Sequence, residues 1–283
     1  YKSFSKAADV MGNNQPNITR CMNILENELG CKLFIRSNRG VQLTIEGERL
    51  FEHVSIAIEQ LVSGENELLK DKGLESGLVN IGASEIALHL FLLNELEVFH
   101  HHYPHVKLRI SNHSTPQAVQ ALENGLVDFA VVSTPVALKK PLQRIPLYSF
   151  HEILIGGEEY AEMASKKHSL QELQDIPLIG IAPGTSTREL YTQYFMRHNL
   201  PFSPDMEVAT TDQILPMIQH NLGIGFLPEE LAAEHIANGK IIQIPIAEPL
   251  PERKICLIRN VKRPQSIAAR SLEEHLTAHR ETE

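Results

Sequence analysis

The chain has 283 residues, of which 42% are hydrophobic, enough to bury cores in two or three domains of ordinary size. Its formal net charge is −9, but residues 1–49 hold seven Lys or Arg against five Asp or Glu, which leaves −11 for the remainder. Any nucleic-acid contact is therefore expected at the N-terminal end. No apolar run reaches membrane-spanning length and nothing at the start resembles a signal peptide, so we expect a cytoplasmic protein without a membrane partner.

The first expected element is a short helix over residues 5–11. Ser5 can cap its start, and Gly12 ends it. A second helix is expected from Gln15, because Asn14 supplies N-cap chemistry and Pro16 is tolerated in the first turn of a helix. The pattern predicts two helices joined by a tight turn.

The second helix is expected to have one apolar and one polar face. Its apolar residues recur at spacings of four, three and four, which predicts an inward face of Ile18, Met22, Leu25 and Leu29. The other face carries amide, hydroxyl and guanidinium groups, which read base edges in the DNA major groove. We expect residues 15–20 to read base edges, and the full set expected to contact DNA from this helix is Asn14, Gln15, Pro16, Asn17, Thr19, Arg20 and Asn23.

A basic hairpin follows this helix. A strand over residues 32–35, a turn over residues 36–40 and a second strand over residues 41–43 form a wing that carries Arg36 and Arg39. Arginines at such a place can reach phosphates or a narrow minor groove. The alternative stays open here, because capped helical hairpins also occur in globular proteins that never touch DNA.

A long helix of about 27 residues, roughly 40 Å, is expected after Thr44, a plausible cap. Its apolar residues have heptad-compatible spacing, which favours pairing with a second copy of the chain. The expected dimerisation residues are Leu50, Val54, Ala57, Leu61 and Leu68. Packing of this stripe against the chain's own larger domain is the alternative.

Beyond a polar hinge at residues 71–77 the pattern changes to alternating strands and helices. Strands are expected at residues 78–83, 107–111, 129–133, 152–155, 178–182, 206–209, 223–228 and 254–259. Helices are expected at residues 87–103, 116–124, 188–198, 212–221 and 265–278. The last strand and helix are expected to return to the first half, so that two connections cross between two α/β lobes.

Hydroxyl side chains recur where the predicted strands end. Open α/β sheets bind ligands beyond the carboxyl ends of their strands, where helix N-termini offer free N–H groups to anions. We expect a small-molecule effector, a small anion or metabolite, to contact Ser84, Ser133, Thr134, Thr185, Ser186, Thr187 and Thr210. Taken singly, each of these residues is as easily explained as a helix cap or turn residue.

The remaining chemistry is sparse. Cys21, Cys31 and Cys256 have no metal-site spacing and are expected to be small buried or half-buried residues, with a redox role for the first two as the less favoured alternative. The histidines at residues 100–102 and 105 are expected to form a solvated helix end, not a metal site. The sequence has no nucleophile elbow, phosphate loop or complete dinucleotide motif, so we expect neither an enzyme nor a resident cofactor.

The N-terminal stretch resembles the winged helix-turn-helix of LysR-type transcriptional regulators. The similar stretch is AADVMGNNQPNITRCMNILENELGCKLFIRSNRGVQLTIEG, in which Ala7, Ala8, Gln15, Pro16, Thr19, Leu25, Glu26, Leu29, Gly30, Leu33, Phe34, Arg36, Leu43, Thr44 and Gly47 carry the likeness. The segments LVNIGAS, FHHHYPHVKLRI, LENGLVDFAVV and LGIGFLP resemble the effector-binding domain of the same family, which is similar in fold to type 2 periplasmic binding proteins. The chain departs from the family in Cys21 and Asn14, and the family's first helix would lie mostly before Tyr1, which predicts a truncated N-terminus.

The resemblance implies an α/β protein with an all-α winged helix-turn-helix at residues 1–46, a linker helix and hinge at 47–77, and a two-lobed domain at 78–283. Lobe I is expected at residues 78–148 and 254–283, and lobe II at 149–253. The implied function is a bacterial, homodimeric or homotetrameric transcription regulator that binds double-stranded promoter DNA under control of a small-molecule effector. A solute-binding protein or an enzyme on the same scaffold is the alternative, because a fold does not fix a function.

Overall fold

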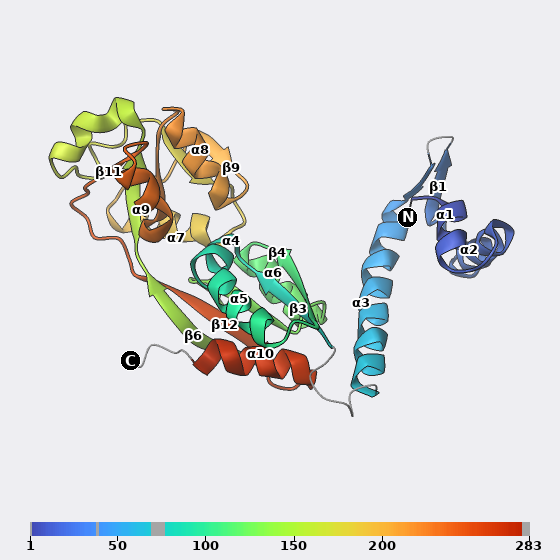
Figure 1. Cartoon of the computed structure of the whole chain (residues 1–283). Coiled ribbons are helices and arrows are strands. Elements are labelled where there is room, and N and C mark those ends of the chain that lie inside the picture. Colours follow the sequence, from blue (N-terminus) through green and yellow to red (C-terminus); the bar gives the residue numbers. More distant parts are fainter. Residues whose placement is uncertain (1, 38–39, 69–76, 279–283) are drawn as a thin grey trace. The chain divides into compact units, whose positions relative to one another are not determined.

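The structure is a computed structural model that describes residues 2–37, 40–68 and 77–278, with the backbone alone at residues 63–68. The chain divides into two compact units, Tyr1–Gly64 and Glu65–Glu283 (Figure 1). The predicted hinge at 71–77 lies, apart from Gly77, outside the described residues. None of the described helices is both long and apolar enough to cross a membrane.

The N-terminal unit consists of helices and one hairpin. Its elements are α1 (Phe4–Val10), α2 (Gln15–Leu29), β1 (Phe34–Ser37), β2 (Gly40–Leu43) and α3 (Ile45–Leu68). Ser3, not Ser5, caps α1, because its hydroxyl accepts a hydrogen bond from the Lys6 N–H, and the helix therefore begins one residue earlier than expected. Asn14 caps α2 as predicted, and Gly30 ends it in the left-handed conformation that glycine adopts without strain.

The first strand of the wing lies two residues later in the chain than predicted, whereas the second begins one residue earlier and ends where it was predicted to end. The first strand runs through Phe34–Ser37 and pairs antiparallel with Gly40–Leu43. Lys32 and Leu33 do not belong to the hairpin, because both bind Glu26 of α2. The Lys32 ammonium group and the Leu33 backbone N–H donate to the Glu26 carboxylate. Arg36 consequently stands on a strand and not in the turn.

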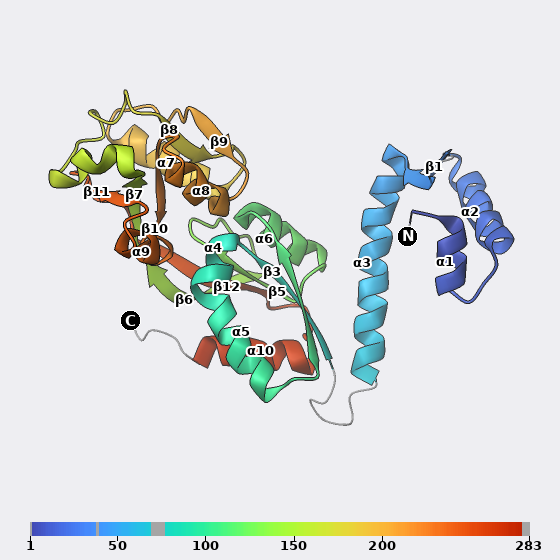
Figure 2. The ribbon, with the colours of Figure 1, turned by 45° about the horizontal axis from the view of Figure 1, so that its top comes forward.

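The larger unit holds two five-stranded sheets, each the centre of one lobe (Figures 1 and 2). The first sheet, lobe I, has the order β4-β3-β5-β12-β6. Its strands are β3 (Gly77–Ala83), β4 (Val106–Asn112), β5 (Phe129–Ser133), β6 (Leu142–Phe150) and β12 (Arg253–Asn260). Its helices are α4 (Glu85–Ala87), which continues through the π-helical turn η2 (Leu88–Leu92) into α5 (Leu93–His102), then α6 (Thr115–Asn124) and α10 (Ile267–Ala278).

Strands in the middle of this sheet are buried on both faces. Phe129 and Val131 of β5 pack into the cluster that contains α5 and α10, whereas Ala130 and Val132 pack into the cluster that contains α6. Side chains alternate between the faces of a strand, so an uninterrupted apolar run predicts helices on both sides. The helices of lobe I cover its sheet in this way (Figure 2).

Lobe II has the order β11-β7-β10-β8-β9. Its strands are β7 (Glu152–Gly156), β8 (Leu178–Ile181), β9 (Met206–Val208), β10 (Ile224–Pro228) and β11 (Ile242–Ile244). Its helical segments are η3 (Glu158–Ser165), α7 (Ser186–Arg197), η4 (Thr211–Gln213), α8 (Ile214–Gln219) and α9 (Glu229–Ala237). The chain enters this lobe between β6 and β7 and leaves it between β11 and β12, so two connections cross between the lobes as predicted.

Several elements differ from the sequence-based expectation. The helices after Ser84 and Thr185 each begin two residues earlier than predicted, because both hydroxyls act as N-caps. The predicted helix over residues 212–221 consists of η4 and the shorter α8. Strands β6 and β11 and helices η3 and α9 were not predicted.

Candidate functional site

The first candidate site is the outward face of α2. Gln15, Pro16, Thr19, Arg20 and Asn23 line one shallow groove together with Ile24 and Asn27. Gln15 and Arg20 are exposed, and Thr19 is half-buried. Five of the predicted DNA-binding residues thus share a surface of the size and polarity that a base edge or a backbone phosphate can meet.

Asn14 and Asn17 are partly engaged in the turn before α2. The Asn14 side chain accepts a hydrogen bond from the Asn17 N–H at 3.0 Å, and the Asn17 side-chain amide donates to Oδ1 of Asn13 at 3.1 Å. These bonds stabilise the N-terminus of α2 and hold the two side chains at its first turn.

Arg36 and Asn23 bind each other. The Arg36 Nη2 atom donates to Asn23 Oδ1 at 2.6 Å, and the guanidinium carbon lies 4.9 Å from the centre of the Phe4 ring. The contact joins the wing to α2 and presents both side chains as one polar feature. Arg39, the other predicted wing contact, lies outside the described residues.

Glu26 is buried between α2 and the wing. Its Oε1 atom accepts hydrogen bonds from the N–H groups of Leu33 and Phe34 at 2.9 and 3.1 Å, and Lys32 Nζ lies 2.8 Å from Oε2. The Lys32 hydrogen bond, followed by that of Leu33, lowers the pKa of Glu26 to about 2. Leu29, expected on the inward face, is instead 49% exposed, so the expectation was wrong there.

Helix α3 carries an exposed apolar stripe. Val54, Ala57 and Leu61 of the predicted dimerisation set are exposed, Leu50 is half-buried, and the side chain of Leu68 lies outside the described residues. Two exposed apolar residues at heptad-like spacing were not predicted, Phe51 (60%) and Ile58 (55%). With Val54 and Leu61 they form a continuous stripe, the α3 stripe.

The second candidate site is a cleft of about 400 Å³ between the two lobes. The cleft is lined from lobe I by residues around Ser84, Thr115 and Ser133, and from lobe II by residues around Thr187 and Thr211. Six of the predicted effector-binding residues line it: Ser84, Ser133, Thr185, Ser186, Thr187 and Thr210. The structure therefore brings hydroxyls from strand ends of both lobes to one cavity.

Three helices begin at this cleft. The helical run through α4 and α5 follows Ser84, α6 follows Ser114, and α7 follows Thr185. N–H groups in a first helical turn have no intrahelical acceptor, and the helix dipole favours negative charge there. The cleft therefore suits an anion.

Thr134 is the predicted effector residue that the structure places beside the cleft lining. Its Oγ1 atom accepts from the Lys254 N–H at 2.9 Å, and its carbonyl oxygen accepts from Arg253 Nε at 2.8 Å. The polar atoms of Thr134 thus serve the junction between β5 and β12.

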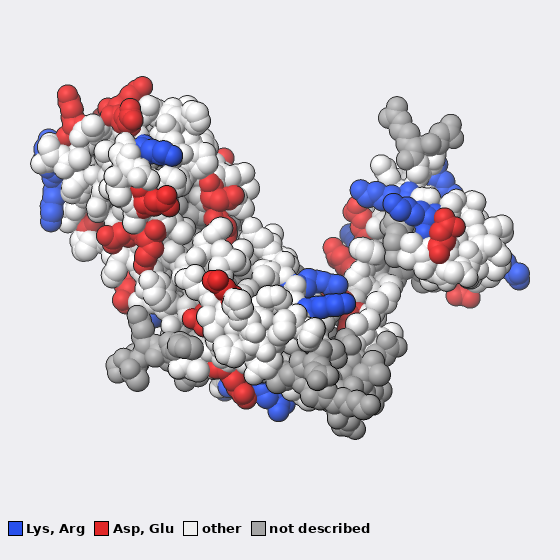
Figure 3. Space-filling model, in the orientation of Figure 1, with Lys and Arg blue, Asp and Glu red and all other residues white. Residues whose placement is uncertain are grey.

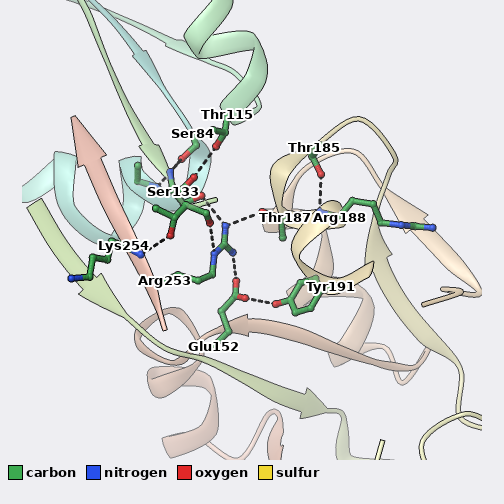
Figure 4. Close-up of polar contacts among 12 residues, drawn as sticks. Ser84, Thr115, Ser133, Glu152, Thr185, Thr187, Arg188, Tyr191, Arg253 and Lys254 are labelled. Carbon is green, nitrogen blue, oxygen red and sulfur yellow. Dashed lines mark hydrogen bonds and ion pairs between the residues drawn. The ribbon is translucent and has the colours of Figure 1, made fainter. Parts of the chain in front are cut away.

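A buried charge network joins the lobes behind the cleft (Figure 4). Arg253, at the start of β12 in lobe I, forms an ion pair of 2.6 Å with Glu152, at the start of β7 in lobe II. The Arg253 Nη2 atom also donates to Ser133 Oγ at 3.0 Å and Thr187 Oγ1 at 3.1 Å. Tyr191 donates its hydroxyl hydrogen to Glu152, and burial followed by the Glu152 charge raises the pKa of Tyr191 well above its usual range.

Sequence reasoning missed both Arg253 and Glu152. Each stands at the first position of a strand. The hydroxyl residues were predicted from their places where strands end, so the same criterion did not select these two. Because Glu152 compensates the Arg253 charge, the network supports the cleft and adds little free positive charge to it.

Glu85 is the one carboxylate among the described residues that line the cleft. It follows Ser84 in the first turn of α4, and its Oε2 atom accepts from the Asp212 N–H of lobe II at 3.0 Å. This hydrogen bond ties the lobes together at the cleft itself.

The cysteines and the surface charges were also predicted from the sequence. Cys21 is exposed, which corrects the expectation of burial, whereas Cys31 is half-buried and Cys256 is buried. On the face shown in Figure 3, acidic side chains are spread over the two-lobed unit and basic side chains gather on part of the N-terminal unit. The two-lobed unit also shows basic patches in this view, so the charge division expected from the sequence is only partial on this face.

Comparisons with known proteins extend these observations. The family described as "Bacterial regulatory helix-turn-helix protein, lysR family" matches residues 1–48, and that described as "LysR substrate binding domain" matches residues 72–281. The HTH-type transcriptional regulator BbuR of Bordetella bronchiseptica is 28% identical over 252 residues, which cover 89% of this chain and 76% of the relative.

Solved structures share the fold. Full-length CbnR complexed with its target DNA is similar with a TM-score of 0.74 and 18% identity, covering 98% of this chain and 94% of that chain. The regulatory domain of CcmR from Synechocystis PCC6803, in complex with 2-PG, is similar with a TM-score of 0.64 and 18% identity, covering 72% of this chain and 97% of that chain. The fold class predicted from the sequence is confirmed.

Proposed function

Since the chain belongs to the LysR family of transcriptional regulators, we propose that α2 and the wing bind double-stranded promoter DNA and that a small anion in the cleft controls this binding. The observation that carries the proposal is the groove on α2, where Gln15, Thr19 and Arg20 lie together. In this arrangement Gln15 and Arg20 read base edges, whereas Arg36 and Asn23 contact the backbone beside them.

Control by an effector follows from the cleft. A ligand that binds residues of both lobes favours the closed arrangement of the lobes, and an effector changes a population only by its differential affinity for two states. The proposed contacts are Ser84, Ser133, Thr185, Ser186, Thr187 and Thr210. The solved CcmR regulatory domain with 2-PG supports a small ligand in this fold.

Self-association completes the proposal. A pair of recognition helices fixes the spacing of two half-sites on DNA, and the α3 stripe offers a seam for pairing two copies of α3. The proposed role involves no catalysis, and the relatives are named as transcriptional regulators. A solute-binding protein on the same scaffold is distinguished from a regulator by DNA binding.

DNA binding is tested by titrating the full chain against a labelled duplex from the region flanking its own gene and against a scrambled duplex, at several salt concentrations. We expect salt-sensitive binding that prefers the native duplex. Arg20→Ala should reduce that preference by about 1–3 kcal/mol, whereas Lys167→Ala, which removes an exposed charge of lobe II, should leave it unchanged. Equal binding of both duplexes by the parent chain contradicts the regulator proposal.

A second variant separates base reading from backbone contact. Arg39→Ala should weaken binding to both duplexes by a similar factor and reduce the slope of log K against log salt by about 1. A change confined to the native duplex would instead assign base reading to the wing.

A further inference from the structure

The Glu85 carboxylate lies in the cleft among many hydroxyl side chains. The Glu85 side chain is half-buried, and the Asp212 N–H, at 3.0 Å, donates to it. Burial raises the pKa of Glu85 and the Asp212 carboxylate adds to this, whereas the N–H groups of Asp212 and Thr211 and the charge of His89 lower it; the result is a pKa above the ordinary value. Burial in the cleft therefore outweighs the contacts that favour the negative charge of Glu85.

The titratable groups that face Glu85 are few. Asp212 faces it from lobe II, His89 lies one turn later on the same helical run, and His113 lines the cleft after β4. Among the described residues that line the cleft there is no lysine or arginine. The nearby Arg253 donates its hydrogen bonds to Glu152, Ser133, Thr187 and the carbonyl oxygen of Thr134.

The opposite wall of the cleft has the opposite preference. Helix α7 is 12 residues long and begins at the cleft. Thr185 caps it, because its Oγ1 atom accepts a hydrogen bond from the Arg188 N–H at 3.1 Å. The N–H groups of Ser186 and Thr187 belong to the first turn, where intrahelical acceptors are missing. An anionic group is favoured at this wall and disfavoured next to Glu85.

We propose that the ligand of this cleft is a small zwitterion, with its anionic group at the first turn of α7 and its ammonium group at the Glu85 carboxylate. This assignment rests on the proposed function, because it takes the cleft to be the effector site. The ammonium group forms a charge-assisted hydrogen bond with Glu85, and the two ends of the ligand engage opposite lobes. A dianion of the same length meets repulsion from Glu85, which gives the site its selectivity.

The test compares acids that differ by one amino group. The full chain is titrated calorimetrically with alanine and propionate, with 4-aminobutyrate and butyrate, and with glutamate and glutarate. At least one amino compound should bind roughly tenfold or more tighter than its partner, the gain expected from one charge-assisted hydrogen bond. Glu85→Gln keeps an acceptor for the Asp212 N–H and should abolish this preference, whereas Glu123→Gln, on the exposed face of α6, should retain it.

The outcomes separate this inference from the proposed function. If the acids without an amino group bind as tightly as their partners, the zwitterion assignment is wrong and the cleft remains an anion site. If none of the six compounds binds, the assignment is also overturned, and the DNA titration described above decides the proposed function on its own.

A measurement without any ligand tests the same charge. Because the pKa of Glu85 is raised in the folded state, its ionisation destabilises the fold as the pH rises above its unfolded value of 4.5. The melting temperature of Glu85→Gln should therefore gain on that of the parent chain between about pH 4.5 and 7. Parallel melting profiles across this range would show that the Glu85 charge is already compensated, which overturns the proposal.

Discussion

Glu26 shows how one charged side chain positions a functional hairpin. The carboxylate binds two backbone N–H groups at the start of β1 and the ammonium group of Lys32. A glutamate on a helix ordinarily points into solvent, but Glu26 is buried, and its bonds hold the wing against α2. The wing's place beside α2 thus depends on an ionised group.

The depressed pKa of Glu26 gives a pH dependence with a definite sign. A group whose folded pKa is about 2, below the unfolded value of 4.5, stabilises the fold above pH 4.5 and loses that contribution as the pH falls towards 2. Glu26→Gln should lower the melting temperature of the N-terminal unit at pH 7 and flatten its decline between pH 4.5 and 2. Glu28→Gln, on the exposed side of α2, is the control; coincident profiles for the two variants would contradict this role.

The buried pair of Arg253 and Glu152 predicts a large effect on stability. Their side chains are 1% and 3% exposed, so removal of one partner leaves an uncompensated buried charge. Arg253→Met should lower the free energy of unfolding by about 3–5 kcal/mol in urea titrations followed by circular dichroism. Arg270→Met, at an exposed position of α10, should change it by less than about 0.5 kcal/mol.

A double-mutant cycle tests whether the two charges act as a pair. Arg253→Met combined with Glu152→Gln should cost clearly less than the sum of the two single changes, because the double variant leaves no charge without its partner. Additive losses would assign the stability to packing of each side chain alone.

For single residues, the helix caps could be predicted from the sequence, whereas the charged residues that pair across the fold could not. Asn14 and Thr44 could be assigned as caps because a cap needs only neighbours a few residues away. Arg253 bonds to residues 66 to 120 positions away, and its local sequence gives no sign of them. The burial of Glu26 was missed for a different reason: its partners lie only six to eight residues away, but they stand at the start of the wing, and the helical pattern of α2 does not show that the wing folds back onto this side chain.

Among the elements, the junction of the wing and α3 is the tightest. A Cβ atom at Gly47, in the first turns of α3, would lie 2.1 Å from the carbonyl oxygen of Leu33. The N–H of Gly47 also donates to the Thr44 hydroxyl that caps the helix. The close approach of α3 to the wing requires glycine at this point.

Gly47→Ala therefore separates packing from helix propensity. Alanine favours a helix by about 1 kcal/mol over glycine, but here the clash with the backbone should destabilise the N-terminal unit by a net ~1–3 kcal/mol. Glu52→Ala, in the exposed middle of α3, has no such clash and should be neutral or slightly stabilising. Thermal unfolding of both variants measures whether the close contact at Gly47 limits the stability of the N-terminal unit.

Element prediction failed where tertiary context overrode local signals. The β6 strand contains Pro146, which argues against a strand, yet β6 is an edge strand and its pairing with β12 shifts register beside that proline. The central strand β5 was predicted with its observed bounds, because a short apolar run between turn residues is unambiguous in an α/β context. Helix α9 follows Pro228 directly and has a weak apolar pattern.

For the whole molecule, the α3 stripe predicts self-association. Phe51, Val54, Ile58 and Leu61 are all exposed in the single chain, and a seam of this kind is buried when two helices pair. Ile58→Glu would place a charge in that seam and should weaken the dimer by roughly tenfold or more. The measurement is molar mass by light scattering over a dilution series, with Glu52→Gln as the control; an unchanged mass would place the interface elsewhere.

The overall architecture could be read from the sequence, but the balance of charges in the cleft could not. Alternating strands and helices, with a late return of strand and helix, predict two lobes and two crossings. The carboxylate of Glu85 and the network of Arg253 become visible only when both lobes are in place. Glu85 is also the residue that gives the cleft its proposed selectivity.

The position of β12 in the first sheet has a consequence for synthesis of the chain. This strand lies between β5 and β6, yet it is made after all of lobe II. A nascent chain on the ribosome can thus complete lobe II while the sheet of lobe I still lacks a central strand. During that interval β5 has one unpaired edge, and β6 lacks β12, the strand it pairs with in the finished sheet. Lobe I, although begun first, is therefore finished last, and its exposed edges are where a chaperone would act.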